Sequence, residues 1–188
     1  MYNLYNVTET SFIRRILGRN RFVACTEAAS LDAINWANPS SSMSKDELKR
    51  LYATGAHTAN GGRTTAQMFA AIFTRYHHTP DRVTSFSDAL AKLRDGNVLT
   101  VAGDYGTLGT HFARWDLRFA RGARPALHAV CVGPIDPITA ASPDPLVAWR
   151  DPLAPAGYNR WEWARWSMVI SFSIGAKDML AYEHGAWI

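Results

Sequence analysis

The hydrophobic positions of this chain follow a helical period in its first half and a strand period in its second half. Small and apolar residues recur three and four positions apart over residues 24–36. This spacing predicts a helix that is buried around much of its girth and ends at Asn38 and Pro39. Shorter helical patterns cover residues 12–17, 47–52 and 68–76. Ser87 is the expected N-cap of a further helix through Leu90 and Leu93 that stops at residues 95–97.

Continuous or alternating apolar runs then predict strands. The pattern indicates buried strands over residues 98–102, 125–132 and 146–149, and a last strand over residues 168–174. Residues 103–106 are predicted to form the turn that leaves the first of these strands, and residues 177–182 a brief helix. The irregular, Arg-rich residues 108–124 suit a loop or short helix. Helices followed by strands predict an α+β fold, with an N-terminal helical subregion packed on an antiparallel sheet.

Composition limits the domain count and the class of partner. With 188 residues, 47% of them hydrophobic and 19% charged, the chain suits one well-packed domain over residues 1–188. The net charge is +4, but no run of five or six basic residues is present. We therefore do not expect a nucleic-acid-binding arm. A mildly basic surface favours anionic polymers in general, cell-wall polymers included, without selecting one.

The chain lacks two patterns that would direct it to a membrane. No charged segment followed by an apolar one marks a signal peptide at the N-terminus. No apolar run approaches the roughly 18 residues of a membrane-spanning helix. We expect a protein that has no membrane span and is not exported by the signal-peptide route, or that travels as part of something larger.

Cysteine chemistry is the first candidate for function. The chain has two cysteines, Cys25 and Cys131, which is too few for a disulfide framework, although the two could pair with each other. Cys25 falls in the first turn of the predicted helix over residues 24–36. Unpaired N–H groups and the positive end of the helix dipole favour an anion there, which lowers the pKa of a thiol and raises its thiolate fraction.

An imidazole and a carboxylate follow on two predicted strands. In a regular strand, His128 and Val130 share one face, while Cys131 lies on the other. Cys131 is therefore the expected buried structural thiol, and Cys25 the expected partner of the imidazole. The short spacing from His128 to Asp151 suits a hairpin, which sets these two residues on adjacent strands about 4.8 Å apart, within side-chain hydrogen-bond reach.

These segments together resemble a known family. The blocks are Cys25-Thr26-Glu27-Ala28-Ala29-Ser30, Gly103-Asp104-Tyr105, His128-Ala129-Val130 and Asp151-Pro152-Leu153. In this order they look like the successive blocks of papain-like cysteine peptidases. The branch most similar is that of the bacteriocin-processing, double-glycine-leader peptidases and their relatives encoded by phages of actinobacteria. The similarity runs from about Arg21 to Ile174 and rests on the joint order of short blocks. It implies a papain-like fold.

The resemblance also implies roles for individual residues. It makes Cys25 the nucleophile, His128 the general acid and base, and Asp151 the residue that orients the imidazole. Such enzymes stabilise the oxyanion with the N–H of the nucleophile itself and usually with a Gln about six residues earlier. Here Arg19 stands at that position, and Asn20 is the nearest amide that can replace the Gln. An oxyanion donor is worth roughly 10²–10³ in rate, so this departure bears on activity.

Further residues border the expected site. Asp104, Tyr105 and Trp161 are candidates for substrate binding, although a turn at a strand end explains the first two equally well. Three indoles, Trp161, Trp163 and Trp166, suit a substrate groove, core packing or a subunit interface. The adjacent His77 and His78 point about 100° apart in a helix and have no ligand neighbours, so no metal site and no cofactor are expected.

Two functions follow as expectations. The first is a thiol peptidase or amidase that is associated with a phage particle, such as its tail. Its substrate would be peptide or amide bonds in peptidoglycan or in a virion precursor. It would lie in the virion, or in the host cytoplasm before assembly. The second is a catalytically weak or inactive papain-like domain that serves as a structural or adaptor subunit and contacts other virion proteins. A nucleic-acid binder has only the net charge in its favour.

Overall fold

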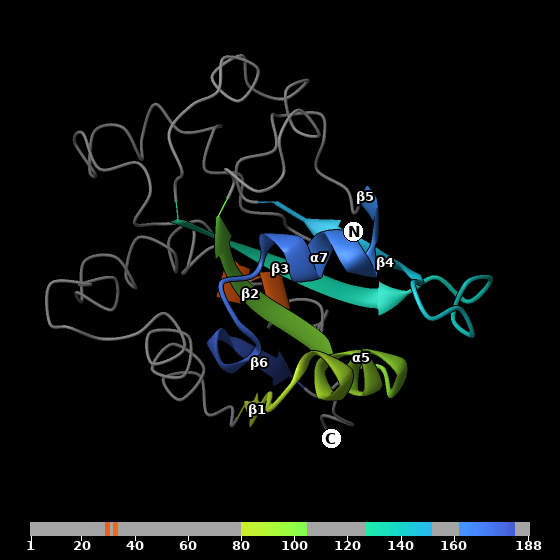
Figure 1. Ribbon diagram of the computed structural model, residues 1–188, viewed down its shortest axis with the longest axis horizontal. Coiled ribbons are helices and arrows are strands. Elements are labelled where there is room, and N and C mark those ends of the chain that lie inside the picture. The colour runs from red at the N-terminus through yellow and green to blue at the C-terminus, as the bar shows by residue number, and fades with distance from the viewer. Residues whose placement is uncertain (1–28, 31, 34–79, 105–126, 152–161, 183–188) are drawn as a thin grey trace, which may run out of the picture.

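A six-stranded antiparallel sheet organises the structure (Figure 1). The computed structural model describes residues 29–30, 32–33, 80–104, 127–151 and 162–182. The strands are β1 (Asp81–Arg82), β2 (Val98–Asp104), β3 (Leu127–Ile135), β4 (Leu146–Arg150), β5 (Glu162–Arg165) and β6 (Met179–Tyr182), in the order β1-β6-β2-β3-β4-β5. Two α-helices, α5 (Phe86–Arg94) and α7 (Trp166–Phe172), accompany them. The α+β class and the antiparallel sheet are as the sequence predicts.

The central strands β2 and β3 are buried on both faces. Leu99 and Val101 of β2 belong to the hydrophobic core that α5 and α7 help to form. Thr100 and Ala102 point to the opposite face and are 0% and 3% exposed. Burial on both sides explains why the sequence shows a continuous apolar run at residues 98–102 and no alternation. The sheet is therefore the middle layer of the described structure.

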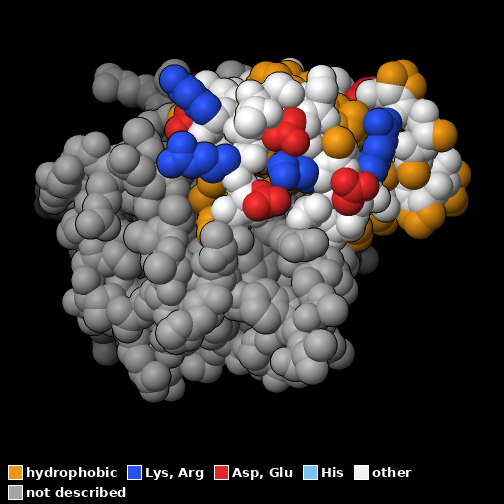
Figure 2. Space-filling view, turned by 90° about the horizontal axis from the view of Figure 1, so that it is seen from below, with side chains coloured by type: hydrophobic (Ala, Val, Ile, Leu, Met, Phe, Trp, Pro, Cys, Tyr) orange, Lys and Arg blue, Asp and Glu red, His pale blue; other side chains and the backbone are white. Residues whose placement is uncertain are grey.

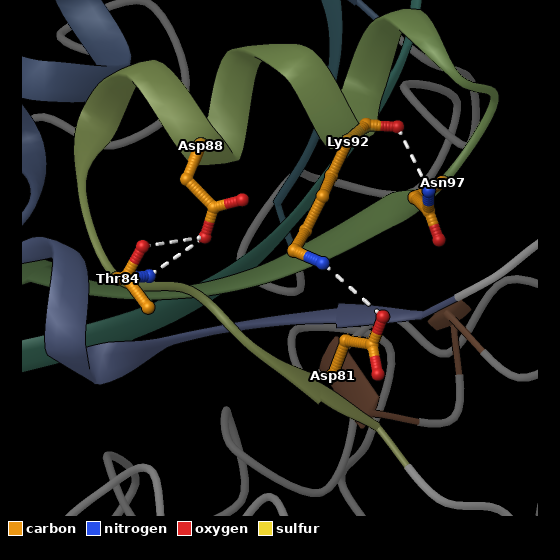
Figure 3. Close-up of polar contacts among 5 residues, drawn as sticks. All are labelled: Asp81, Thr84, Asp88, Lys92 and Asn97. Carbon is orange, nitrogen blue, oxygen red and sulfur yellow. Dashed lines mark hydrogen bonds and ion pairs between the residues drawn. The ribbon is translucent and has the colours of Figure 1, made fainter.

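The N-cap of helix α5 lies two residues before the predicted one. The cap is Ser85, whose hydroxyl accepts a hydrogen bond from the Asp88 backbone N–H at 3.0 Å. The Asp88 carboxylate reaches back and accepts from the N–H and hydroxyl of Thr84 at 2.8 and 3.0 Å (Figure 3). The N–H of Thr84 is the main cause of the lowered pKa of Asp88. The prediction of Ser87 was wrong because only Ser85 lies three residues before an acid that can complete this reciprocal capping.

The other end of α5 is as predicted. The Asn97 side-chain amide donates to the Lys92 carbonyl at 2.9 Å, and Gly96 takes the left-handed conformation at φ +88°. The ammonium of Lys92 also forms an ion pair at 3.1 Å with Asp81 on the edge strand β1 (Figure 3). These contacts end the helix and tie it to the edge of the sheet.

Helix α7 replaces the strand predicted over residues 168–174. Its buried residues Trp166, Val169 and Phe172 recur every three positions, which is a helical spacing, while the residues between them are partly or fully exposed. Asp144 accepts hydrogen bonds from the Ser167 N–H at 2.7 Å and from its hydroxyl at 3.0 Å. A carboxylate from another segment thus satisfies an N–H group in the first turn, and the β-branched Val169 and Ile170 do not prevent the helix.

The prediction of a brief helix over residues 177–182 was wrong for most of its length. A 3₁₀ turn, η5 (Ala176–Asp178), is followed by strand β6, which lies between β1 and β2. Gly103 and Asp104, predicted as part of a turn, continue β2 as far as its pairing with Leu127. The strand state of these residues depends on partners far away in the chain, which local patterns do not show.

Helix α7 approaches the sheet most closely at Gly103. A Cβ built on Gly103 would overlap the carbonyl oxygen and the ring of Phe172. The backbone of Gly103 also pairs with Ser173 just after the helix. Phe172 in turn packs edge-on against Trp149 of β4, with ring centroids 5.0 Å apart. Gly103 is therefore needed because a side chain there would displace α7.

We expect Gly103→Ala to lower the free energy of unfolding by about 1–3 kcal/mol, because the new methyl group overpacks the contact with Phe172. In a chain of this length each kcal/mol corresponds to about 2–4 °C in melting temperature, which calorimetry would measure. Gly96→Asn is the matched control. Nothing lies within 4 Å of its Cβ position, and Asn tolerates a positive φ, so the loss should be smaller. Equal losses in the two variants would contradict the close-approach argument.

Candidate active site

His128 and Asp151 lie side by side at one end of the sheet. His128 is the second residue of β3, and Asp151 directly follows β4, which pairs antiparallel with β3. The Nε2 atom of His128 is 2.9 Å from Oδ1 of Asp151. Both side chains are 0% exposed. The two residues are 23 positions apart in the chain, and the hairpin predicted from the sequence brings them together.

The imidazole lies on the face of the sheet that carries α7. His128 pairs directly with Gly103 of β2, so the two residues share a face. That face is covered at Gly103 by Phe172 of α7. Val130, two residues further along β3, belongs to the same hydrophobic core as Phe172. The candidate base therefore sits where aromatic and aliphatic side chains exclude water.

The contact at Nε2 determines what the ring can do. A carboxylate accepts hydrogen bonds, so Asp151 favours the tautomer with its proton on Nε2. Nδ1 is then the basic nitrogen of the neutral ring. When Nδ1 takes a proton, the carboxylate stabilises the resulting imidazolium, and it does so strongly in a site of low dielectric constant. This arrangement suits a general base whose orientation is fixed by its neighbour.

Cys131 lies on the other face of the sheet, as the strand alternation predicts. It pairs with Thr100 of β2 and Arg150 of β4. It is a free, fully buried thiol, so the open question of a bridge to Cys25 is answered against pairing. Burial is the largest cause that raises the pKa of Cys131 well above its usual value; Asp32 raises it further and Arg150 opposes this. Cys131 is therefore held as a neutral thiol.

A buried ion pair lies on the same face of the sheet as Cys131, and it was not predicted from the sequence. The Nε atom of Arg150 donates to Oδ2 of Asp32 at 3.4 Å, and the two side chains are 1% and 0% exposed. A signal for it was present. Asp32 lies three residues after Ala29 and four after Ala28, within the small-residue stripe of the predicted helix. An acid on a buried helical stripe requires a buried basic partner.

The described part of the predicted helix over residues 24–36 packs on the face opposite α5 and α7. Ala29, Ser30, Asp32 and Ala33 are helical and buried. Figures 1 and 3 both show this segment on the side of the sheet away from α5. Asp32 of this segment contacts Arg150, the neighbour of Asp151 in the chain. The described part of this helix therefore lies near the end of β4, on the face of the sheet opposite the imidazole.

Some of the remaining predicted site residues lie among the residues that the structure describes, and others lie outside them. Asp104 lies at the end of β2 and is partly buried. Of the indoles, Trp163 on β5 is 52% exposed, whereas Trp166 is 4% exposed and belongs to the core. The predicted nucleophile, oxyanion donor and two substrate contacts lie outside the described residues: Cys25, Asn20, Tyr105 and Trp161.

Positively and negatively charged side chains are mixed among the described residues on the face that Figure 2 shows. On the face shown in Figure 2, Lys and Arg side chains lie among Asp and Glu side chains, and hydrophobic side chains gather towards one end. The hairpin between β3 and β4 carries Ile138, which is 92% exposed. The described residues on that face form no single-sign field of the kind that steers a polyanion.

Comparison with known proteins adds no relative. No family model, no curated protein and no solved structure matches this chain. Among the described residues, no group of three or more His, Cys, Asp or Glu side chains is arranged to hold a metal ion. The described helices are all too short or too polar to cross a membrane. Interpretation of the site therefore rests on its own geometry.

We expect Cys131 to resist alkylation in the native protein, because burial keeps its thiol neutral and away from the reagent. Treatment with iodoacetamide at pH 8, followed by peptide mass spectrometry, should leave Cys131 unmodified until denaturant unfolds the chain. The same sample after unfolding is the control, and it should show complete modification. Rapid modification of Cys131 in the native state would contradict the burial described here.

Proposed function

We propose that this protein is a thiol peptidase or amidase in which His128, oriented by Asp151, serves Cys25. The observation that carries the proposal is the 2.9 Å contact between Nε2 of His128 and Oδ1 of Asp151. Two residues singled out in the sequence for these roles meet at this distance on adjacent strands. The resemblance to papain-like peptidases supplies the nucleophile, and a papain-like arrangement of residues 1–188 is part of the proposal.

The chemistry follows from the orientation of the ring. Nδ1 of His128 takes the proton of the Cys25 thiol, and the thiolate attacks the carbonyl carbon of the substrate. A C–S bond forms, and the amine leaves with the proton held at Nδ1. Water then attacks the thioester while Nδ1 takes its proton, which releases the acid and restores the thiol. Asp151 holds the tautomer and stabilises the imidazolium in both steps.

The oxyanion needs donors that the chain can supply. In this proposal they are the backbone N–H of Cys25 and the side-chain amide of Asn20, which replaces the Gln found in similar peptidases. Substrate contacts come from Asp104, Tyr105 and Trp161. An amide placed one residue away from the usual position weakens the hydrogen bond, and poor alignment of one donor lowers the rate by up to roughly 10²–10³. The proposed enzyme is therefore a slow one.

The substrate class comes from the resemblance to phage-encoded peptidases. Peptide or amide bonds of bacterial peptidoglycan are the proposed target, with a virion precursor as the alternative substrate. We place the protein in the virion, at the tail, or in the host cytoplasm before assembly. A mildly basic chain, at +4, favours approach to the anionic polymers of a cell wall.

A second function is favoured by the burial of the dyad. The side chains of both His128 and Asp151 are 0% exposed, and the described helical residues 29–30 and 32–33 lie on the opposite face of the sheet. A buried, hydrogen-bonded His–Asp contact also stabilises a fold without catalysis. In this alternative the chain is an inactive papain-like domain that serves as a structural or adaptor subunit of a phage particle.

Thiol reactivity separates the two functions. If His128 takes the Cys25 proton, Cys25 should react with iodoacetamide well below the usual thiol pKa of about 8.5, because thiolate persists there. His128→Ala should slow alkylation of Cys25 at pH 6 by about 10-fold or more, and Asp151→Asn by less. Cys131 is the control within each sample. If His128→Ala leaves the pH dependence of Cys25 alkylation unchanged, the role as a structural subunit is favoured.

Release of free amino groups from purified peptidoglycan tests the substrate. The native protein should release them, and Cys25→Ala should abolish the release while the melting temperature stays within about 2–4 °C of the original, which corresponds to roughly 1 kcal/mol. Cys131→Ala is the matched control, since it removes the other thiol and should preserve release. Release of amino groups by the Cys25→Ala variant would exclude a mechanism that uses the Cys25 thiol.

A further inference from the structure

The hairpin that joins β3 to β4 presents one apolar side chain almost fully to solvent. Ile138 is 92% exposed, although the turn around it is well hydrogen-bonded. Its backbone N–H donates to Oδ1 of Asp136 at 3.1 Å, and the hydroxyl of Thr139 donates to Oδ2 of Asp136 at 3.1 Å. That hydroxyl also accepts from the N–H of Leu146 at 2.9 Å, across the hairpin. Ile138 is therefore displayed by a preorganised turn, which loses little conformational freedom on binding.

An apolar hollow of about 680 Å³ lies beside this side chain, between the C-terminal end of α5 and the hairpin. Its lining is apolar apart from one basic residue, and consists of Leu93, Arg94, Gly96, Pro134, Ile135, Ala140 and Ala141. Ile138 is two residues before Ala140, so the exposed side chain and the hollow are neighbours. Figure 1 shows the hairpin projecting beyond the sheet, and Figure 2 shows hydrophobic side chains gathered at that end.

The hollow and the side chain beside it have complementary shapes. A single exposed apolar side chain is common on protein surfaces and needs no explanation. Here an aliphatic projection adjoins an apolar space that has room for it together with the exposed Pro137. A twofold interface brings the same patch of two copies together, so a projection that adjoins a hollow can enter the hollow of the other copy. One patch thus supplies both halves of such a contact.

The charges beside the two features are also complementary. Arg94 lines the hollow, and its Nη2 donates to the carbonyl oxygen of Ser142 at 3.0 Å. None of the ion pairs among the described residues involves Arg94 or Asp136. A guanidinium has five N–H donors, and a carboxylate has acceptor sites beyond the two that the turn uses. Entry of Ile138 into the hollow of another copy brings the neighbouring Asp136 towards that copy's Arg94.

We propose that this protein associates with a second copy of itself, with Ile138 of each copy entering the hollow between α5 and the hairpin of the other. Apolar burial supplies the attraction, and the Asp136–Arg94 pairs fix the relative orientation of the copies. Seven residues line the hollow, fewer than the roughly 20–30 on each side of a standard interface, so the dimer is reversible and depends on concentration. The proposal uses no residue of the candidate active site and is independent of the proposed function.

Analytical ultracentrifugation over a range of protein concentrations tests the association. The native protein should shift from monomer to dimer as its concentration rises. Ile138→Ser should weaken dimerisation by about 100-fold, because each copy loses its buried aliphatic group. Arg94→Met should weaken it by a smaller factor, about 3-fold to 10-fold, since an exposed ion pair contributes less.

Ile174→Ser is the matched control. Ile174 is 46% exposed and lies beside the end of β2, where its N–H donates to the Ala102 carbonyl, whereas the hairpin lies at the other end of β3. This variant should leave the dissociation constant unchanged. Because both isoleucines are exposed, the two serine variants should keep the native melting temperature, which circular dichroism would verify.

A mixture of two variants tests whether the contact is reciprocal. Ala141→Arg places a long charged side chain in the exposed lining of the hollow and should prevent entry of Ile138. Mixed with Ile138→Ser, it provides one intact projection and one intact hollow. The mixture should therefore form a dimer that neither variant forms alone, weaker than the native dimer.

Two results would overturn the proposal. One is a native protein that stays monomeric at every concentration; binding of an apolar dye to the hollow of that monomer would assign the hollow to a different ligand. The other is a native dimer whose dissociation constant is changed by neither Ile138→Ser nor Ala141→Arg, which would place the interface on another surface.

Discussion

The antiparallel pairing of β3 with β2 on one side and β4 on the other is the constraint on which the rest depends. Once Gly103 is paired with His128 and Arg150 with Cys131, the alternation of the strands assigns each side chain to a face. His128 joins the face covered by α7, while Cys131 and Arg150 join the face where residues 29–33 pack. A slip of β3 by one residue would move His128 to the face that carries Arg150 and Cys131 to the face covered by α7.

The two faces carry different chemistry because they are closed by different elements. On one face, the missing side chain of Gly103 lets Phe172 approach the sheet, and the indole of Trp149 packs against it. The His–Asp contact is thereby kept among apolar groups, where a charged pair is strengthened. On the other face, Asp32 enters a buried layer and requires Arg150 as its partner. The sheet thus separates the His128–Asp151 contact from the Asp32–Arg150 ion pair.

Local sequence patterns were reliable where an element is defined by its own residues. The end of α5 follows from Gly96 and Asn97, whose conformations and hydrogen bonds are local. The buried strand β2 follows from its apolar run, and the β3–β4 hairpin from two such runs separated by a turn-rich segment. The predictions of secondary structure were wrong where contacts with a distant segment determine whether residues form a helix or a strand. The helical state of residues 166–172 is aided by Asp144, and β6 exists because it fills the place between β1 and β2.

By itself, then, the sequence determined the α+β class, the central strands and the nearness of His128 to Asp151, since these depend on hydrophobic periodicity and short connections. Only the tertiary structure decided which face holds the imidazole, how closely α7 packs over Gly103, and that Asp32 finds Arg150 118 residues away. Such contacts between distant segments are selected by packing and burial of the whole chain, and no local pattern encodes the partner.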